Sequence, residues 1–218
     1  FNGRHELLDS VFLWQSGNKY RVSAHDADMK ETEAIYGQTD SGMTIIEGHL
    51  FLNGKKPIQH RSSYGLGEVI KAALDNHTEH LVISLGGIGS FDGGAGMLQA
   101  LGARFYDDEA QIVDMRKGAD LIKYIRRIDL SGVHPQLAKV NIQLMSDFSS
   151  RLYGKKSEIM QTYESLDLSQ NEAAEIDNLI WYFSELFKNE LKIAMGPIER
   201  GGAGGGIAAV LNSLYQAE

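Results

Sequence analysis

The chain has 218 residues, of which 43% are hydrophobic and 23% are charged, a balance typical of globular proteins with one substantial core or two small ones. It contains no cysteine, so disulfides, thiolate nucleophiles and cysteine metal sites are excluded. The formal net charge of −8 argues against a nucleic acid partner, because a polyanion is repelled overall. No apolar run approaches the roughly 18 residues of a membrane span and no signal segment opens the chain, so we expect a cytoplasmic protein with no membrane partner.

The first quarter of the chain predicts a short helix followed by a small β-rich unit. Apolar residues recur at helical spacing within residues 1–13, and three extended runs follow at 19–24, 33–38 and 43–52. Turn signals between these runs favour antiparallel pairing over residues 19–52. Glu47 interrupts the apolar run TIIEG and has two interpretations, a carboxylate on the solvent side of a half-buried strand or a functional group.

The segment at residues 81–102, LVISLGGIGSFDGGAGMLQALG, predicts a strand, a glycine-rich turn and a helix. Six glycines lie between Gly86 and Gly96. The turn either holds an anion on amide groups at the helix N-terminus or only packs the helix closely on the sheet. The glycine spacing matches neither the dinucleotide fingerprint nor the Walker phosphate loop.

Two further helices have recognisable start signals. Residues 62–76 predict a helix with Gly65 as its N-cap and Glu68 at its third position. Ser169 and Glu172 form a capping box in front of a strongly amphipathic pattern. The apolar stripe of that second helix is expected to be core.

Between these helices the chain predicts short strands. Runs at 104–106 and 112–115 flank the acidic triplet 107–109, which favours a solvated hairpin tip over a Mg²⁺ site. Residues 142–145 predict a buried strand that ends just before Asp147. A carboxylate at the end of a strand either contributes to a ligand site in an open α/β sheet or caps the following loop.

A second glycine cluster, residues 201–206, leads directly into a helical pattern at 207–216. Chance rarely supplies two glycine clusters that each precede a helix. We therefore expect the two clusters to line one cleft.

Three of these segments resemble motifs of the glycerate kinase family, the bacterial type that transfers phosphate from ATP to D-glycerate. The first is SSYGLGEVIKAAL at 62–74, similar to the family's TSYGTGELI. The second is GGIGSFDGGAGMLQALGARFYD at 86–107, similar to its GGSATNDGGAGMLQALGA block. The third is ERGGAGGGIAAVL at 199–211, which resembles its PGAGAAGGLG loop, and the three keep the family's order and spacing.

The resemblance covers nearly the whole chain and only the middle of the family's length. It implies one glycerate-kinase-like α/β domain over residues 1–218, with the family's flanking segments absent. We expect a mostly parallel sheet flanked by helices, in which residues 19–52 form the small β-rich N-terminal unit.

The chain also departs from the family pattern. The family's ADGGEGT motif has its best counterpart at residues 2–7, which lose the acidic positions in register. Phe91 stands where the family has asparagine, although the neighbouring Asp92 is kept. Asp147 is retained from the family's CDVTNPL segment, and Glu47 matches the glutamate of its AVIEMA strand.

Phosphoryl transfer to a hydroxyl requires amide or cationic groups for the phosphate oxygens, carboxylates for Mg²⁺ and a group that accepts the hydroxyl proton. The resemblance implies ATP and Mg²⁺ as cofactors, with Asp92 and Asp147 as catalytic residues, either of which could bind Mg²⁺. It implies Arg61 for the carboxylate of D-glycerate. The other residues expected to bind substrate or phosphate are Glu47, Ser63, Gly86, Gly87, Ser90, Gly93, Gly94, Gly201, Gly202 and Gly204.

Two classes of function remain open. In the first, the chain is part of an active glycerate kinase, which the glycine clusters and the two aspartates favour. In the second, it is a catalytically inactive relative or domain fragment that binds a small acid or a protein, which Phe91 and the substitutions at 2–7 favour. The oligomeric state is also open.

Overall fold

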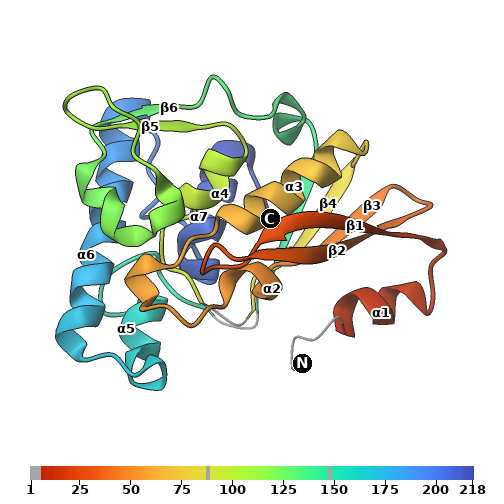
Figure 1. Cartoon of the computed structure of the whole chain (residues 1–218), viewed down its shortest axis with the longest axis horizontal. Coiled ribbons are helices and arrows are strands. Elements are labelled where there is room, and N and C mark those ends of the chain that lie inside the picture. Colours follow the sequence, from red (N-terminus) through yellow and green to blue (C-terminus); the bar gives the residue numbers. More distant parts are fainter. Residues whose placement is uncertain (1–5, 87–88, 147–148) are drawn as a thin grey trace.

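A five-stranded sheet organises the described part of the chain, which comprises residues 6–86, 89–146 and 149–218 of a computed structural model (Figure 1). The strand order is β1 (Gly17–His25), β2 (Glu31–Thr39), β3 (Met43–Glu47), β4 (His80–Ser84) and β7 (Asn141–Met145). β3, β4 and β7 run parallel, and β1 and β2 extend the sheet by antiparallel pairing. Helices flank the sheet, so the predicted α/β class is confirmed.

The predicted β-rich unit forms the antiparallel side of this sheet. β1 pairs with β2, and the stacked rings of Tyr20 and Tyr36, 5.2 Å apart, lie across that pair. The prediction of one extended run over 43–52 is wrong, because β3 ends at Glu47 and the helical turn α2 (His49–Leu52) follows. Phe51 and Leu52 are both buried, which a helical turn allows and a half-exposed strand with alternating side chains does not.

The two faces of the parallel strands are covered differently. Ile46, Leu81 and Ile83 point into the main core, to which α3 (Tyr64–Asp75), α4 (Ala95–Ala100) and α7 (Ile207–Tyr215) also contribute. The alternate residues Ile45 and Val82 point to the other face and pack with α1 (Glu6–Phe12). This alternation is the period-two pattern of strands buried on both sides.

The start of α3 differs from the sequence prediction. Its N-cap is Ser63 rather than Gly65, and the carboxylate of Glu68 accepts a 2.9 Å hydrogen bond from His25 N at the end of β1. A Cβ atom at Gly65 would collide with His25 O. Gly65 therefore permits close packing of α3 against β1, which a local capping pattern does not predict.

A second group of elements lies beyond α4. β5 (Arg104–Tyr106) pairs with β6 (Arg127–Asp129), α6 (Gln170–Leu186) contacts β5, and α5 (Glu158–Thr162) packs against α6. The predicted strand at 112–115 is wrong: Ile112 makes only an isolated bridge to Tyr106, and Asp114 then caps the helical turn that begins at Met115. The remaining short helical turns of the described chain are Ile58–His60, Met115–Lys117, Ala119–Tyr124, Pro135–Ala138, Tyr163–Leu166, Phe187–Leu191 and Ala203–Gly206.

The predicted capping box at the start of α6 is confirmed. Ser169 Oγ accepts a hydrogen bond from Glu172 N at 3.3 Å, and Glu172 Oε2 accepts one from Ser169 N at 2.8 Å. The ring of Phe183 packs edge-on against Phe105 and fastens α6 to β5.

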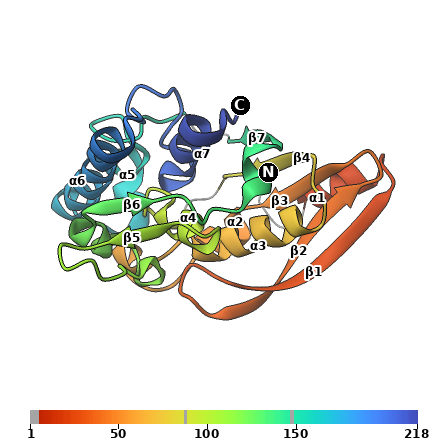
Figure 2. The ribbon, with the colours of Figure 1, turned by 90° about the horizontal axis from the view of Figure 1, so that it is seen from above.

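The elements are spread along the long axis of the molecule. In both ribbon views α6 lies at one end and the β1–β2 hairpin, with α1 beside it, at the other (Figures 1 and 2). Among the helices that the structure describes, none combines the length and apolar character that crossing a membrane requires. α3, α4 and α7 occupy the middle, where the glycine-rich segments lie.

Candidate functional site

The carboxyl ends of β3, β4 and β7 meet at one edge of the sheet. Glu47 pairs in register with Ser84, and Ser84 pairs with Met145. The chain then turns away at once, with Gly48 N donating to Ser84 O at 2.8 Å and Leu85 N to Met145 O at 2.7 Å. Open α/β sheets bind ligands at this edge, so the loops after these strands form the candidate site.

The two glycine-rich segments, which the sequence predicts to line one cleft, touch each other. Gly93 N donates a 3.0 Å hydrogen bond to Gly205 O. A Cβ atom at Gly205 would collide with the carbonyl oxygen of Ser90, and one at Gly206 would lie 2.8 Å from Gly93 Cα. Gly93 and Gly205 also have positive φ values of 64° and 65°, which residues with side chains rarely adopt. The glycines let the two backbones pack directly together.

Asp92 is wholly buried beneath the first of these segments. Its Oδ2 accepts hydrogen bonds from Ser63 N at 2.8 Å, Ser63 Oγ at 2.9 Å and Gly96 N at 3.1 Å, and its Oδ1 accepts one from Gly94 N at 3.0 Å. Burial raises the pKa of the Asp92 carboxyl group, and the hydrogen bonds from Ser63 oppose that rise. Ser63 Oγ in turn accepts from Met97 N at 2.9 Å. Asp92 and Ser63 thus join the start of α3 to α4.

The amide groups of the first glycine segment fall into two sets. Those of the glycines after Asp92 already donate within the protein. In the part of the chain that the structure describes, the amides of Gly89, Ser90 and Phe91 have no acceptor, and Ser90 Oγ is buried without a partner. Since buried donors are normally paired, residues 89–91 are the part of this segment that can bind an anion.

In the second glycine segment two of the three predicted glycines, Gly201 and Gly202, have amides that already donate within the protein. Gly201 N donates to Ile198 O at 3.2 Å, and Gly202 N donates to Ser150 O at 3.3 Å. Gly204 has a φ of 65°, and a Cβ atom there would lie 3.1 Å from Leu85 Cδ2. This segment holds the first one in place, and its predicted role in phosphate binding stays a prediction.

Arg61 lies beside the free amides. Its Nε donates to Lys56 O at 2.8 Å and its Nη1 donates to Gly89 O at 3.1 Å. Among the described residues, Arg61 Nη2 has no acceptor. A half-buried guanidinium held in this way presents one edge to an oxyanion next to residues 89–91.

The remaining predicted site residues differ in burial and in hydrogen bonding. Glu47 is 3% exposed, and its Oε1 accepts a 3.1 Å hydrogen bond from Leu7 N at the start of α1. Gly86 is partly exposed in the loop after β4. Gly87 and Asp147 lie outside the described residues, so the role predicted for each stays a prediction.

Phe91 is a structural residue that sequence reasoning had identified only as a departure from the family pattern. Its ring is 3% exposed and packs in a small core with Ile58, Ile159, Ala173 and Ile176. The core fastens the first glycine segment to α5 and α6. In the sequence, only the apolar character of Phe91 indicated that its ring is buried. The residues that pack around the ring come from distant parts of the sequence.

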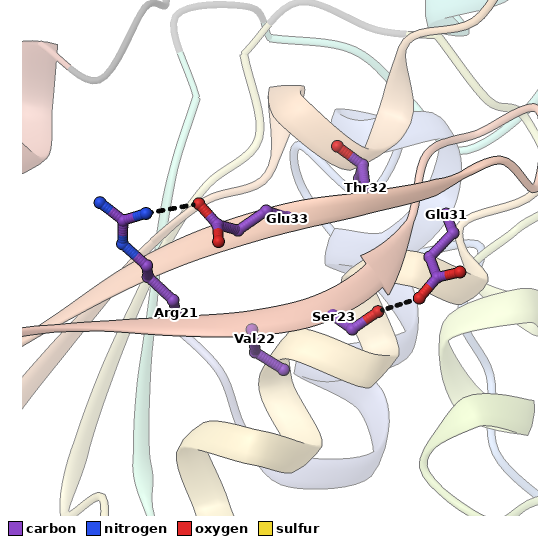
Figure 3. A pocket seen from close by; sticks show the side chains of 6 residues that line it. All are labelled: Arg21, Val22, Ser23, Glu31, Thr32 and Glu33. Carbon is purple, nitrogen blue, oxygen red and sulfur yellow. Dashed lines mark hydrogen bonds and ion pairs between the residues drawn. The ribbon is translucent and has the colours of Figure 1, made fainter.

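Two other features of the described chain do not add to this site. No group of three or more His, Asp or Glu side chains that could hold a metal ion occurs within it. A pocket of about 390 Å³ lies on β1 and β2, and none of the residues that line it is a predicted site residue (Figure 3). Its charged side chains are engaged within the pocket, since Arg21 pairs with Glu33 at 2.9 Å and Ser23 donates to Glu31 at 2.8 Å.

The sheet edge and the glycine segments define an α/β protein with glycine-rich loops at the ends of parallel strands. The model of the glycerate kinase family matches residues 7–218. The chain belongs to the glycerate kinase family, as the three sequence motifs predict.

Individual relatives agree with this assignment. The chain is 30% identical to a glycerate kinase of Halalkalibacterium halodurans, over all of this chain and 58% of that protein. It is 31% identical to the glycerate 2-kinase of Escherichia coli over 72% of this chain and 41% of that protein. A crystal structure from Salmonella typhimurium LT2, designated glycerate kinase 2, matches with a TM-score of 0.87 and 26% identity over 93% of this chain and 55% of its own. The chain thus spans about half the length of the relatives it matches.

Proposed function

We propose that the chain takes part in phosphoryl transfer from ATP to D-glycerate. A hydroxyl oxygen of glycerate forms a bond to the γ-phosphorus of ATP while the bond from that phosphorus to the bridging oxygen of ADP breaks. The hydroxyl proton passes to a base, and the products are phosphoglycerate and ADP. Membership of the glycerate kinase family and the names of the matched relatives support this proposal.

The observation that carries the proposal is the run of free amides at 89–91 next to Arg61. Both reactants carry oxyanions, a carboxylate on glycerate and phosphates on ATP. Fixed amides and a guanidinium stabilise such groups without reorganising during the reaction. The carboxylate of glycerate fits the free edge of Arg61, since guanidinium and carboxylate groups pair in a fork geometry.

In this proposal Asp92 has a structural role and does not contact the reactants. Its side chain is fully buried and its oxygens accept four hydrogen bonds, so it offers no open oxygen to Mg²⁺ or to a substrate hydroxyl. Among the described residues, no group of three or more His, Asp or Glu side chains could hold a metal ion. We propose that Asp92 fixes the geometry of the first glycine segment.

A coupled assay tests the proposal on the purified chain with ATP and D-glycerate, with the product identified by phosphorus NMR. We expect ATP-dependent phosphoglycerate, and a loss of about tenfold or more in kcat/KM for Arg61→Ala, because a charge-assisted hydrogen bond is removed. Arg21→Ala is the matched control, since Arg21 pairs with Glu33 on β1 away from the site. Absence of product in the unmodified chain would overturn the proposal, and glycerate binding without turnover would favour an inactive binding protein.

A further inference from the structure

Asp28 lies in the turn after β1, and its carboxylate is 4% exposed. Oδ2 accepts a 2.6 Å hydrogen bond from Lys55 N, and Oδ1 accepts a 2.9 Å bond from Lys56 N. Lys56 Nζ donates back to Asp28 O at 2.7 Å. A single buried carboxylate therefore holds the backbone of a turn 27 residues further along the chain.

The turn that carries Asp28 is itself well defined. Asp26 Oδ1 accepts hydrogen bonds from Asp28 N and from Lys30 N, each at 2.9 Å. β2 begins at Glu31, directly after Lys30, and ties this segment into the sheet. Asp28 is thus held by the sheet, which makes it a fixed point for the more exposed turn at 53–56.

Gly54 fits against Asp28 so closely that no side chain can be added there. A Cβ atom at Gly54 would collide with Asp28 Oδ1, would lie 2.8 Å from Asp28 Cγ and would lie 3.3 Å from Arg61 Cδ. Gly54 has no positive φ, so the close approach alone accounts for the glycine. The same turn therefore packs against both Asp28 and the side chain of Arg61.

The turn at 53–56 leads directly to the anion-binding loop. Lys56 O accepts from Arg61 Nε at 2.8 Å, and Arg61 Nη1 donates to Gly89 O at 3.1 Å. On the other side, a Cβ atom at Gly89 would lie 2.5 Å from Asn53 Cα, so the two backbones touch. Hydrogen bonds and close contacts thus run without interruption from Asp28 through Lys56 and Arg61 to Gly89.

The groups around Asp28 favour the ionised form of its carboxyl group. Burial raises the pKa of the Asp28 carboxyl group, but hydrogen bonds from the Lys55 and Lys56 amides and the nearby charges of Arg61 and Lys30 bring it below its usual value of 3.8. At neutral pH a carboxylate therefore accepts both amides, and charge-assisted hydrogen bonds of this kind are the stronger ones.

We propose that Asp28 is a positioning residue for the oxyanion subsite at Gly89–Phe91: it fixes the turn at 53–56, which orients Arg61 against Gly89. Asp28 touches no ligand in this scheme and acts only through Lys56 and Arg61. The ligand chemistry is an oxyanion, a carboxylate or a phosphate. Only the identity of that ligand rests on the function proposed above.

The test compares Asp28→Asn and Gly54→Ala with the unmodified chain. Asp28→Asn weakens one of the two amide contacts, and Gly54→Ala displaces the carboxylate without changing any charge. The matched control is Asp107→Asn, because Asp107 also accepts two backbone amides, Glu109 N at 3.0 Å and Gln111 N at 2.8 Å, in a turn away from the site.

Calorimetry with D-glycerate and, separately, with inorganic phosphate measures oxyanion binding. Comparing the two ligands shows whether the subsite binds a carboxylate or a phosphate. We expect both Asp28→Asn and Gly54→Ala to weaken binding by about tenfold to a hundredfold and Asp107→Asn to leave it unchanged, since a small misplacement of a binding group has effects of this size. In the Arg61→Ala background, Asp28→Asn should cause no further loss. An equal loss with and without Arg61 would overturn the proposal.

Amide chemical shifts provide a readout that needs no ligand. We expect the ¹H–¹⁵N NMR signals of residues 89–91 and of Lys55 and Lys56 to move in Asp28→Asn, with those of α6 unaffected. Unchanged amide shifts at 89–91 would overturn the positioning role. If neither probe binds the unmodified chain, the proposed function fails, while the amide shifts at 89–91 still decide for or against Asp28.

Discussion

The amide of Gly93 donates a 3.0 Å hydrogen bond to the carbonyl oxygen of Gly205, and this bond joins the two glycine-rich segments of the chain. Close approach of the two backbones explains why glycine is needed on both sides. It also explains why many of their amides are unavailable to a ligand. In the first segment, the amides of residues 89–91 are left without an acceptor among the described residues.

Gly205→Ala should strongly destabilise the fold. The new methyl group would collide with Ser90 O, and the residue would keep a φ of 65°. The left-handed conformation costs about 1–2 kcal/mol and overpacking about 1–3 kcal/mol, so we expect a loss of about 2–5 kcal/mol in the free energy of unfolding. Urea denaturation measures it.

Gly154→Ala is the matched control for this substitution. Gly154 also has a positive φ, 88°, but a Cβ atom there would meet nothing within 4 Å. We expect only the conformational cost, about 1–2 kcal/mol. Equal losses for the two variants would show that contact between the glycine segments does not constrain Gly205.

Asp92→Asn should destabilise the fold by about 3 kcal/mol or more. Whichever way the amide is oriented, its NH₂ group replaces an oxygen that accepts a backbone N–H, so buried donors face each other without water. Thermal and urea denaturation measure the loss. A loss below about 1 kcal/mol would contradict the network around Ser63 and Asp92, because surface substitutions alone have effects that small.

Phe91→Asn, which restores the residue type of the family pattern, should destabilise this chain. The substitution removes a buried ring and places an amide among Ile58, Ile159 and Ile176. We expect a loss of about 3–5 kcal/mol in the free energy of unfolding. Trp14→Asn is the control: Trp14 is 89% exposed, so its replacement should have little effect. Similar values for both variants would argue against the small core around Phe91.

Asp28 should contribute stability in a pH-dependent way. Because its pKa is lowered in the folded chain, the unfolded chain binds a proton more readily, and stability is lost as the pH falls below the usual value of 3.8. Above that pH the contribution is fully present. Urea denaturation of the unmodified chain and of Asp28→Asn should show a difference that is constant near neutral pH and narrows in acid. A difference that widens in acid would contradict a lowered pKa.

Local patterns predicted most of the elements and the family. Apolar periodicity indicated α3, α6, α7, β4 and β7. Apolar residues recur with the period of the helix or strand, because one side of the element faces the core. The capping box at Ser169 depends on a contact three residues away, and it was confirmed. The order of three motifs indicated the glycerate kinase family, which the family match confirms.

Contacts between distant segments decided the rest. The strand predicted over 43–52 ends at Glu47, where the turn that follows is set by burial of Phe51 and Leu52 in a core built by other elements. The hydrogen bonds of Asp92 to Ser63, 29 residues away, and of Asp28 to Lys55, 27 residues away, have no local signature. By itself the sequence determined that glycine-rich turns precede two helices. Which amides those turns leave free was decided only when the tertiary structure packed one turn against the other, since a hydrogen-bond donor already satisfied inside the protein is lost to a ligand.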